Sequence, residues 1–389
     1  MNTLIESKPR YEILDGLRGV AALLVVAFHL FEAYASDHTT QIVNHGYLAV
    51  DFFFVLSGYV VAYAYDDRWG KMSVWTFFKR RVIRLHPLVV IGTLLGAALF
   101  YFSAGAKPWP MVETIPWWKT LLTMLFCLTI LPLPKSFDIR GWSETNPFAG
   151  PVWSLQYEYL ANICYALCIR RFKTWMLIAA TGFAAFLTLN LTLNWDVFNT
   201  LSGRAYAAYT VIGGWSVDLE QISIGISRLA YPFLAGLLLA RFKAKVAVTR
   251  GGFALCSALV AAALGMPYFA PKALPVVNGL YEAMTILLVF PLVVVLGAGA
   301  RLNGRVGSSV CRFLGDISYP LYMVHFPFVY MFYAWKNAHE AAPLGTHVLS
   351  GVSIGLLTVA VAWASFKLYD LPVRNWLSGL GKPKERGDR

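Results

Sequence analysis

Apolar segments of about the length of a membrane-spanning helix alternate with short polar stretches along the whole chain. A helix needs roughly 20 apolar residues, and at least about 17, to cross the hydrocarbon core of a bilayer. Ten segments meet this requirement and predict transmembrane helices, near residues 13–34, 46–65, 87–104, 152–169, 174–192, 224–240, 252–270, 280–298, 317–335 and 346–368. The pattern therefore predicts an all-α fold, a polytopic membrane helix bundle of about ten transmembrane helices.

The basic residues between these segments predict the orientation. Both ends of the chain are basic, so both termini are expected in the cytoplasm by the positive-inside rule. We expect one membrane domain over residues 1–375 and a basic cytoplasmic tail over 376–389. An additional apolar segment at 118–134 would break the alternation, because the segment that follows it ends in the basic run 170–173. We therefore expect 118–134 to be re-entrant or interfacial.

The composition supports a membrane protein. Of the 389 residues, 58% are hydrophobic and only 14% are charged, and the mean hydropathy is +0.56, whereas soluble domains have roughly 25% charged residues. The net charge of +12 falls in short runs between apolar segments, where it sets orientation. We therefore expect no nucleic-acid partner. The five cysteines show neither a disulfide framework nor metal-ligand spacing, and we expect no metal.

The first apolar segment carries two ionisable residues. Arg18 stands near the start of the stretch LDGLRGVAALLVVAFHL (residues 14–30) and His29 near its end. About three helical turns separate them, so both side chains are expected on nearly the same face, on the order of 16 Å apart. Ionisable groups inside membrane helices are costly and usually functional. The alternative is that Arg18 marks the cytoplasmic end of the helix and His29 is a satisfied interior ring.

A basic cluster precedes the third segment. Arg80, Arg81 and Arg84 lie in the stretch KRRVIRLHP, and Arg81 and Arg84 would be neighbours on one face of a helix. Two guanidinium groups in that arrangement suit a phosphate, which each can bind through two donors. The alternative is a cluster that fixes topology by contacting lipid head groups.

Carboxylates and hydroxyls inside other segments complete the candidate chemistry. Ser154 and Glu158 are one turn apart at the start of the fourth segment, next to Trp153, and Asp51 lies in the second. A carboxylate inside an apolar helix needs a cation or a hydrogen-bond donor. Glu158 could instead be an interfacial carboxylate favoured by the helix dipole.

The ninth segment supplies a second histidine. His325 follows Ser318 and Tyr319 in the stretch DISYPLYMVH. The sequence contains no Gly-rich phosphate loop, no G-x-S-x-G motif and no H-E-x-x-H motif. A base, carboxylates and donors are thus all expected from within the membrane, and the residues alone leave open whether His29 or His325 is the base.

At these residues the chain resembles the integral-membrane acyltransferase family 3, whose members O-acylate polysaccharides and other exported molecules. The resemblance covers nearly the whole chain and rests on six elements in order: Arg18 and His29, the run VDFFFVLSGY, Arg81 and Arg84 before Pro87, Trp153-Ser154-x3-Glu158, ISYPLYMVH with His325, and the terminal YDLPVR. The set as a whole, rather than any single element, is specific.

The resemblance implies a function. It implies acyl-CoA, usually acetyl-CoA, as a cytoplasmic co-substrate with no permanently bound cofactor, and a glycan or lipid-linked sugar hydroxyl as acceptor. His29 would be the general base or the first acyl acceptor, Arg18 would stabilise an oxyanion or a phosphate, and Glu158 or Asp51 would orient a histidine or Arg18. Arg80, Arg81 and Arg84 would bind acyl-CoA, and Trp153, Ser154, Tyr319 and His325 would support the site. The expected location is the bacterial inner (cytoplasmic) membrane, with membrane lipids as neighbours and an unknown oligomeric state.

Two other functions use the same residues. A proton-coupled transporter or flippase of glycan intermediates would use the buried ionisable groups as a proton relay, although the sequence has no obvious inverted repeat. A non-catalytic subunit of a polysaccharide-export complex is the third hypothesis. Transfer of a labelled acyl group to a glycan would distinguish the transferase from both.

Overall fold

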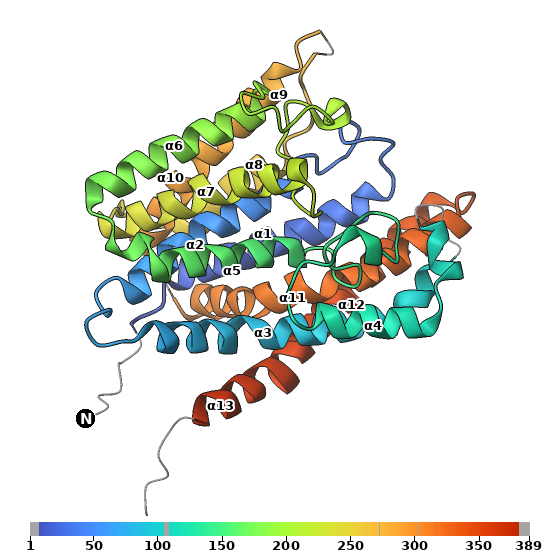
Figure 1. Ribbon diagram of the computed structural model, residues 1–389, viewed down its shortest axis with the longest axis horizontal. Helices are drawn as coiled ribbons and strands as arrows, with labels where there is room; N and C mark the ends of the chain where they lie inside the picture. The colour runs from blue at the N-terminus through green and yellow to red at the C-terminus, as the bar shows by residue number, and fades with distance from the viewer. Residues whose placement is uncertain (1–7, 105–108, 272, 303, 381–389) are drawn as a thin grey trace, which may run out of the picture.

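The computed structural model describes residues 8–104, 109–271, 273–302 and 304–380, and these residues form helices joined by loops and 3₁₀ turns. The helices run side by side in one bundle (Figure 1). In chain order they are α1 (Glu12–Glu32), α2 (Ala49–Tyr65), α3 (Val74–Ala98), α4 (Trp117–Cys127), α5 (Val152–Leu167), α6 (Thr174–Thr192), α7 (Leu219–Arg241), α8 (Gly252–Gly265), α9 (Val276–Met284), α10 (Phe290–Gly299), α11 (Arg305–Ala338), α12 (Leu344–Ala364) and α13 (Leu371–Gly379). Two π-helical turns, Thr285–Val289 and Ser365–Asp370, join α9 to α10 and α12 to α13. The predicted all-α class is confirmed.

Seven stretches in the described part of the chain are long and apolar enough to cross a membrane, which agrees with a multi-pass membrane protein. They are Glu12–Glu32, Gly46–Tyr65, Val74–Ala98, Thr174–Thr192, Leu219–Arg241, Val276–Gly299 and Leu344–Gly379. Three other predicted spans correspond to α5, with 16 residues, α8, with 14, and the long but more polar α11, with 34. The count of ten and the cytoplasmic placement of both termini stay predictions.

Several boundaries differ from the sequence-based expectation. The helix α3 begins at Val74, where Ser73 caps it by accepting a hydrogen bond from the Thr76 amide, rather than near residue 87. The basic cluster lies within this helix, so Arg81 and Arg84 are one turn apart on it, as their spacing predicts. The segment 118–134 forms only the 11-residue α4, too short to cross a bilayer. Its re-entrant or interfacial placement stays a prediction.

The predicted tail begins inside a helix. The expected division between residues 375 and 376 falls within α13, which is continuous from Leu371 to Gly379. Residues 381–389 of the predicted tail lie outside the described residues.

The two ends of the bundle differ. The start of α1 and the start of α3 lie at one end, and the loops that follow α1 and α6 lie at the other (Figure 1). The helix α1 packs along α11, and α2 packs along α7. We call the end with the start of α1 the basic end, because Lys8, Arg10, Arg68 and Arg80 gather there around a common cavity.

Glycines allow the pair α2 and α7 to approach closely. A Cβ atom at Gly58 would lie 2.0 Å from the carbonyl oxygen of Phe233, and one at Gly236 would lie 2.2 Å from that of Val55. Small residues at such contacts bring helix backbones together in a membrane, where no hydrophobic effect drives helices to associate. This contact fixes α2, which forms one wall of the cavity.

We predict that Gly58→Ala destabilises the bundle by about 1–3 kcal/mol, because the added methyl group forces α2 and α7 apart. The measurement is the melting temperature of the purified protein in detergent, together with its abundance in the membrane. Gly182→Ala in α6 is the matched control, since a Cβ there meets nothing within 4 Å. Equal melting temperatures for the two variants would contradict this account of the packing.

Candidate functional site

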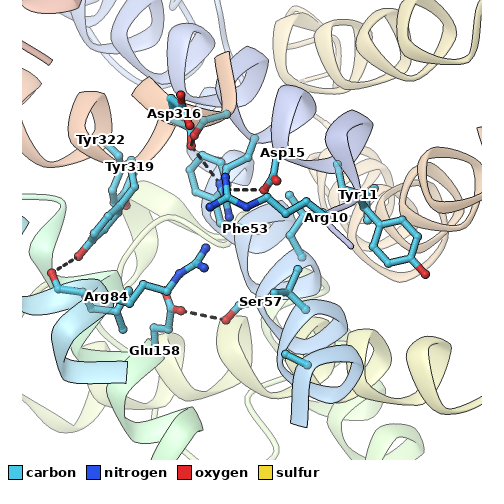
Figure 2. A pocket seen from close by; sticks show the side chains of 18 of the residues that line it. Arg10, Tyr11, Asp15, Phe53, Ser57, Arg84, Glu158, Asp316, Tyr319 and Tyr322 are labelled. Atoms are coloured by element: carbon cyan, nitrogen blue, oxygen red, sulfur yellow. Dashed lines mark hydrogen bonds and ion pairs between the residues drawn. The ribbon is translucent and has the colours of Figure 1, made fainter. Parts of the chain in front are cut away.

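A cavity of about 760 Å³ opens into the basic end of the bundle. Its wall comes from the starts of α1 and α3, from α2, α5 and α11, and from the junction between α12 and α13. Pockets of about 300–1,000 Å³ hold ligands of drug or cofactor size. Figure 2 shows Arg84, Glu158 and Ser57 on one side of this cavity and Asp15 and Asp316 on another. We call it the basic cavity.

The lining is charged and predominantly cationic. Its described cations are Lys8, Arg10, Arg18, Arg68, Arg80, Arg81, Arg84, Arg312 and Arg374, and its described carboxylates are Glu12, Asp15, Glu158, Asp316 and Asp370. Nine cations against five carboxylates leave a positive excess, which favours an anionic ligand.

Arg18 is held at the cavity wall by two partners. Its Nη2 donates to Asp15 Oδ1 at 2.7 Å, and its Nε donates to Ser318 Oγ at 3.0 Å. Ser318 in turn donates to the carbonyl of Gly315 at 2.8 Å. Arg18 therefore contacts α11 through Ser318, and Asp15 is the carboxylate that neutralises it.

Arg81 and Glu158 form an ion pair across α3 and α5. Arg81 Nη2 donates to Glu158 Oε1 at 2.5 Å, and Ser57 Oγ donates to the same oxygen at 3.0 Å. Arg81 is only 5% exposed. Glu158 thus pairs with an arginine and lines the cavity, but its partner is Arg81 rather than the expected Arg18 or a histidine.

Arg84 differs from Arg81 in its exposure and in its lack of a partner. It lies one turn further along α3, its side chain is exposed and it lines the basic cavity. No described residue forms a hydrogen bond or ion pair with its guanidinium group. Of the two arginines predicted to bind phosphate, Arg81 is engaged by the protein and Arg84 is available to a ligand. Arg80 also lines the cavity.

Asp51 and Trp153 lie outside the cavity lining. Asp51 is fully buried and accepts from Arg228 Nη2 of α7 at 2.8 Å. The Arg228 guanidinium lies 5.1 Å from the centre of the Trp153 ring. The expectation that Asp51 orients a histidine or Arg18 is therefore wrong, because its partner comes from α7, a residue that no sequence spacing linked to it.

Aromatic residues close the inner end of the basic cavity. Tyr322 and Phe53 line it, with ring centres 5.4 Å apart. The Tyr322 hydroxyl and Ser154 Oγ share a hydrogen bond of 2.7 Å. Behind Tyr322 lies His325, with 5.9 Å between the ring centres. We call Phe53, Tyr322 and His325 the septum. Tyr319 also lines the cavity and donates to the Leu85 carbonyl at 2.7 Å.

His29 lies on the far side of the septum. Its ring stacks on that of His325 at 5.5 Å between centres, and it is absent from the lining of the basic cavity. Arg18 and His29 therefore do not share the basic cavity, and the rings of Tyr322 and His325 lie between them. Both residues nevertheless contact α11, so the predicted common face is confirmed.

The hydrogen bonds of the two histidines fix their tautomers. His29 Nδ1 lies 2.8 Å from Glu32 Oε2, and His325 Nδ1 lies 2.9 Å from the Tyr322 carbonyl. Carboxylate and carbonyl oxygens accept, so each Nδ1 carries a proton. The Nε2 of His325 is buried without a partner. The side chain of His29 is 18% exposed, so its Nε2 is the more accessible base.

Sequence reasoning missed Glu32 and Tyr333. Glu32 stands three residues after His29, a spacing that places both on one helix face and could have identified the pair. The Tyr333 hydroxyl donates to Glu32 Oε2 at 2.8 Å. Tyr333 lies 301 positions from Glu32 along the chain, so its role depends on the packing of α11 along α1.

A buried polar cluster lies near His29, because the Phe326 ring contacts both the His29 ring and the Tyr330 ring at 4.8 Å between centres. In the loop before α5, both carboxylate oxygens of Glu144 accept from the Tyr330 hydroxyl, at 2.9 and 2.8 Å. The Arg140 guanidinium stacks 3.5 Å from the centre of the Tyr330 ring. Burial raises the pKa of Glu144 to about 7, against the opposing effects of Arg140 and the Tyr330 hydroxyl.

This pKa predicts a pH-dependent stability. Because the pKa of Glu144 in the folded protein lies above its ordinary value of 4.5, the folded state holds the proton more tightly than the unfolded chain. Its contribution is present in full below the ordinary pKa and is lost as the pH rises through the folded one. We therefore expect Glu144→Gln to reduce the fall in melting temperature between about pH 5.5 and about pH 8. Glu113→Gln, at an exposed position, is the control. The same pH dependence in Glu144→Gln and wild type would contradict the assignment.

Comparison with known proteins gives one family match and several relatives. A family profile described as an acyltransferase domain matches residues 11–367. Acyltransferase MdmB of Streptomyces mycarofaciens is 27% identical over 333 residues, which cover 82% of this chain and 78% of that protein. Protein 2 in the picA locus of Rhizobium radiobacter is 35% identical over 163 residues, covering 40% of this chain and 81% of that protein.

A longer relative matches almost the whole chain. O-acetyltransferase OatA of Staphylococcus aureus is 22% identical over 379 residues, covering 94% of this chain and 58% of that protein. The chain thus spans little more than half the length of OatA. No solved structure matches significantly.

Proposed function

The chain belongs to the acyltransferase family whose domain profile matches residues 11–367, and from this premise we propose that it is a membrane-embedded O-acyltransferase. It moves an acyl group, acetyl in the simplest case, from cytoplasmic acyl-CoA to a hydroxyl of an exported or cell-surface glycan or glycolipid. The name of OatA, an O-acetyltransferase, supports the acetyl group and the oxygen acceptor. The organisms of the relatives support a bacterial cytoplasmic membrane.

One observation carries this proposal. A cationic cavity and an accessible imidazole base lie on opposite sides of a thin septum, two ring contacts apart. A donor with several phosphates suits the first, and an alcohol that must lose a proton suits the second. The arrangement supports transfer of an acyl group through the protein from one face to the other.

The donor would occupy the basic cavity. Arg84 and the cations at the cavity mouth are available to phosphates, which guanidinium groups bind through paired hydrogen bonds. The thioester would reach the inner end near Arg18, Ser154 and Tyr322. Arg18, fixed by Asp15 and Ser318, can donate to the carbonyl oxygen as negative charge develops there.

His29 would act on the acceptor. Its Nε2 takes the proton of the acceptor hydroxyl while that oxygen attacks the thioester carbonyl carbon. The C–S bond then breaks, the ester forms, and CoA leaves as a thiolate. The imidazolium releases to water the proton it took from the hydroxyl, and the thiolate takes up a proton from water. Glu32 holds Nδ1–H and stabilises the imidazolium that forms, as a carboxylate behind a catalytic histidine does. The step requires the septum to open enough for the carbonyl carbon to approach His29.

We predict that His29→Gln lowers acyl transfer by about 10²- to 10⁴-fold, because general-base catalysis contributes about that much. The assay uses purified protein in liposomes, acetyl-CoA labelled in the acetyl group, and a glycan fraction from the cell surface as acceptor. His339→Gln, at an exposed position, is the matched control. Label that never enters the glycan with wild-type protein would contradict the transferase and favour a transporter or an assembly subunit.

We also expect Glu32→Gln to lower kcat at least ~10-fold while the KM for acyl-CoA stays within about twofold, because Glu32 acts through His29 and not on the donor. The glutamine preserves the size of the side chain but removes its charge. Glu113→Gln is the control for the loss of a negative charge. A rise in KM with unchanged kcat would show that Glu32 has a different role.

A further inference from the structure

Three close ion pairs join arginines and carboxylates of the basic cavity, and they leave Arg84, like Arg10 and Arg80, without a carboxylate partner among the described residues. Asp15 pairs with Arg18 at 2.7 Å, Glu158 with Arg81 at 2.5 Å and Asp370 with Arg374 at 2.9 Å. Arg84 lies within electrostatic range of all three arginines. Among the described residues, no carboxylate pairs with Arg84. The centre of this group therefore carries an uncompensated positive charge, and an anion is the ligand that would neutralise it.

The C-terminal helix brings Arg374 to this group. The π-helical turn Ser365–Asp370 redirects the chain from α12 into α13, which leaves the bundle and lies beneath α3 (Figure 1). No residue of α13 is buried, yet Leu371 and Arg374 line the basic cavity. Because α13 adds no buried residue to the core, its contribution to the cavity comes from the side chains of Leu371 and Arg374.

Asp370 pairs with Arg374 and has one carboxylate oxygen that accepts no hydrogen bond. Its side chain is 1% exposed, and only Oδ2 has a partner, Arg374 Nη1. Its Oδ1 is buried without a hydrogen bond. A buried acceptor without a donor is costly. Asp370 also lies within electrostatic range of Arg84, so a donor supplied when Arg84 and Arg374 close on a ligand would satisfy it.

We propose that Arg374, positioned by Asp370, forms with Arg84 a binding site for a phosphomonoester of the donor in the wall of the basic cavity. This inference rests on the proposed function, because it takes the donor to be an acyl-CoA. Two guanidinium groups match the charge and the planar donor geometry that a phosphate dianion requires. In coenzyme A the phosphomonoester is the 3′-phosphate of the ribose, which lies at the opposite end of the molecule from the thioester.

The site would therefore select the donor by its remote phosphate. Dephospho-CoA has the same thioester arm and pyrophosphate but lacks the 3′-phosphate. A protein that binds the 3′-phosphate has a higher affinity for CoA than for dephospho-CoA. A protein that binds only the pyrophosphate has the same affinity for both.

The test is equilibrium binding of labelled CoA and of labelled dephospho-CoA to the full-length protein in detergent. We expect wild type to bind CoA at least ~10-fold more tightly, because a charge-assisted contact to a phosphate is worth about a factor of ten or more in the dissociation constant. Arg374→Gln should weaken CoA binding about 10-fold and leave dephospho-CoA binding within about twofold, with Arg374→Lys restoring part of the preference. Arg301→Gln, an exposed arginine outside the cavity lining, is the control for loss of a positive charge.

Each outcome decides a different claim. A preference for CoA that survives in Arg374→Gln, or an equal loss of both ligands, would overturn the assignment of Arg374 and leave the proposed function standing. Absence of binding of either nucleotide to wild type would overturn the assignment together with the acyl-CoA donor. Melting temperatures of the variants separate loss of the site from loss of the fold.

Discussion

The free-energy cost of burying an unpaired charge inside a membrane helix bundle determines how the helices of this protein pack. A charged side chain away from water needs a partner, and the interior helices supply one for nearly every ion they carry. Arg228 and Asp51 are 2% and 0% exposed and pair at 2.8 Å between α7 and α2. Arg241 and Asp66 pair at 2.7 Å near the basic end. Against this background of paired ions, the excess of cations in one cavity stands out as a feature retained for a ligand.

Two functional sites lie along the single helix α1. Arg18 and His29 both belong to α1, but Arg18 lines the basic cavity, whereas His29 lies on the far side of the septum. One long helix, α11, contacts both through Ser318 and His325. The packing of α1 along α11 therefore sets the relation between a site suited to an anionic donor and a site suited to an alcohol. A transferase that works across a membrane needs that separation, because donor and acceptor arrive from different compartments.

Much of the fold was predictable because hydrophobic periodicity and basic flanks depend on local sequence. The helices near 13–34 and 174–192 were placed within two residues at each end. The pairings were not predictable in the same way. Asp51 and Arg228 are 177 positions apart, and Arg81 and Glu158 are 77 apart, so only the packing of four helices determines which carboxylate meets which arginine. Glu32, three residues from His29, is the exception that local spacing could have supplied.

In the proposed mechanism, donor and acceptor react from opposite faces of the septum. This mechanism is tested most directly in liposomes that hold the protein in one orientation, with acyl-CoA supplied on a single side and the acylated acceptor collected from each side separately. The account predicts transfer only when acyl-CoA is on the side of the basic cavity, with the acylated product on the other side. Equal transfer with acyl-CoA on either side, or product confined to the donor side, would contradict it.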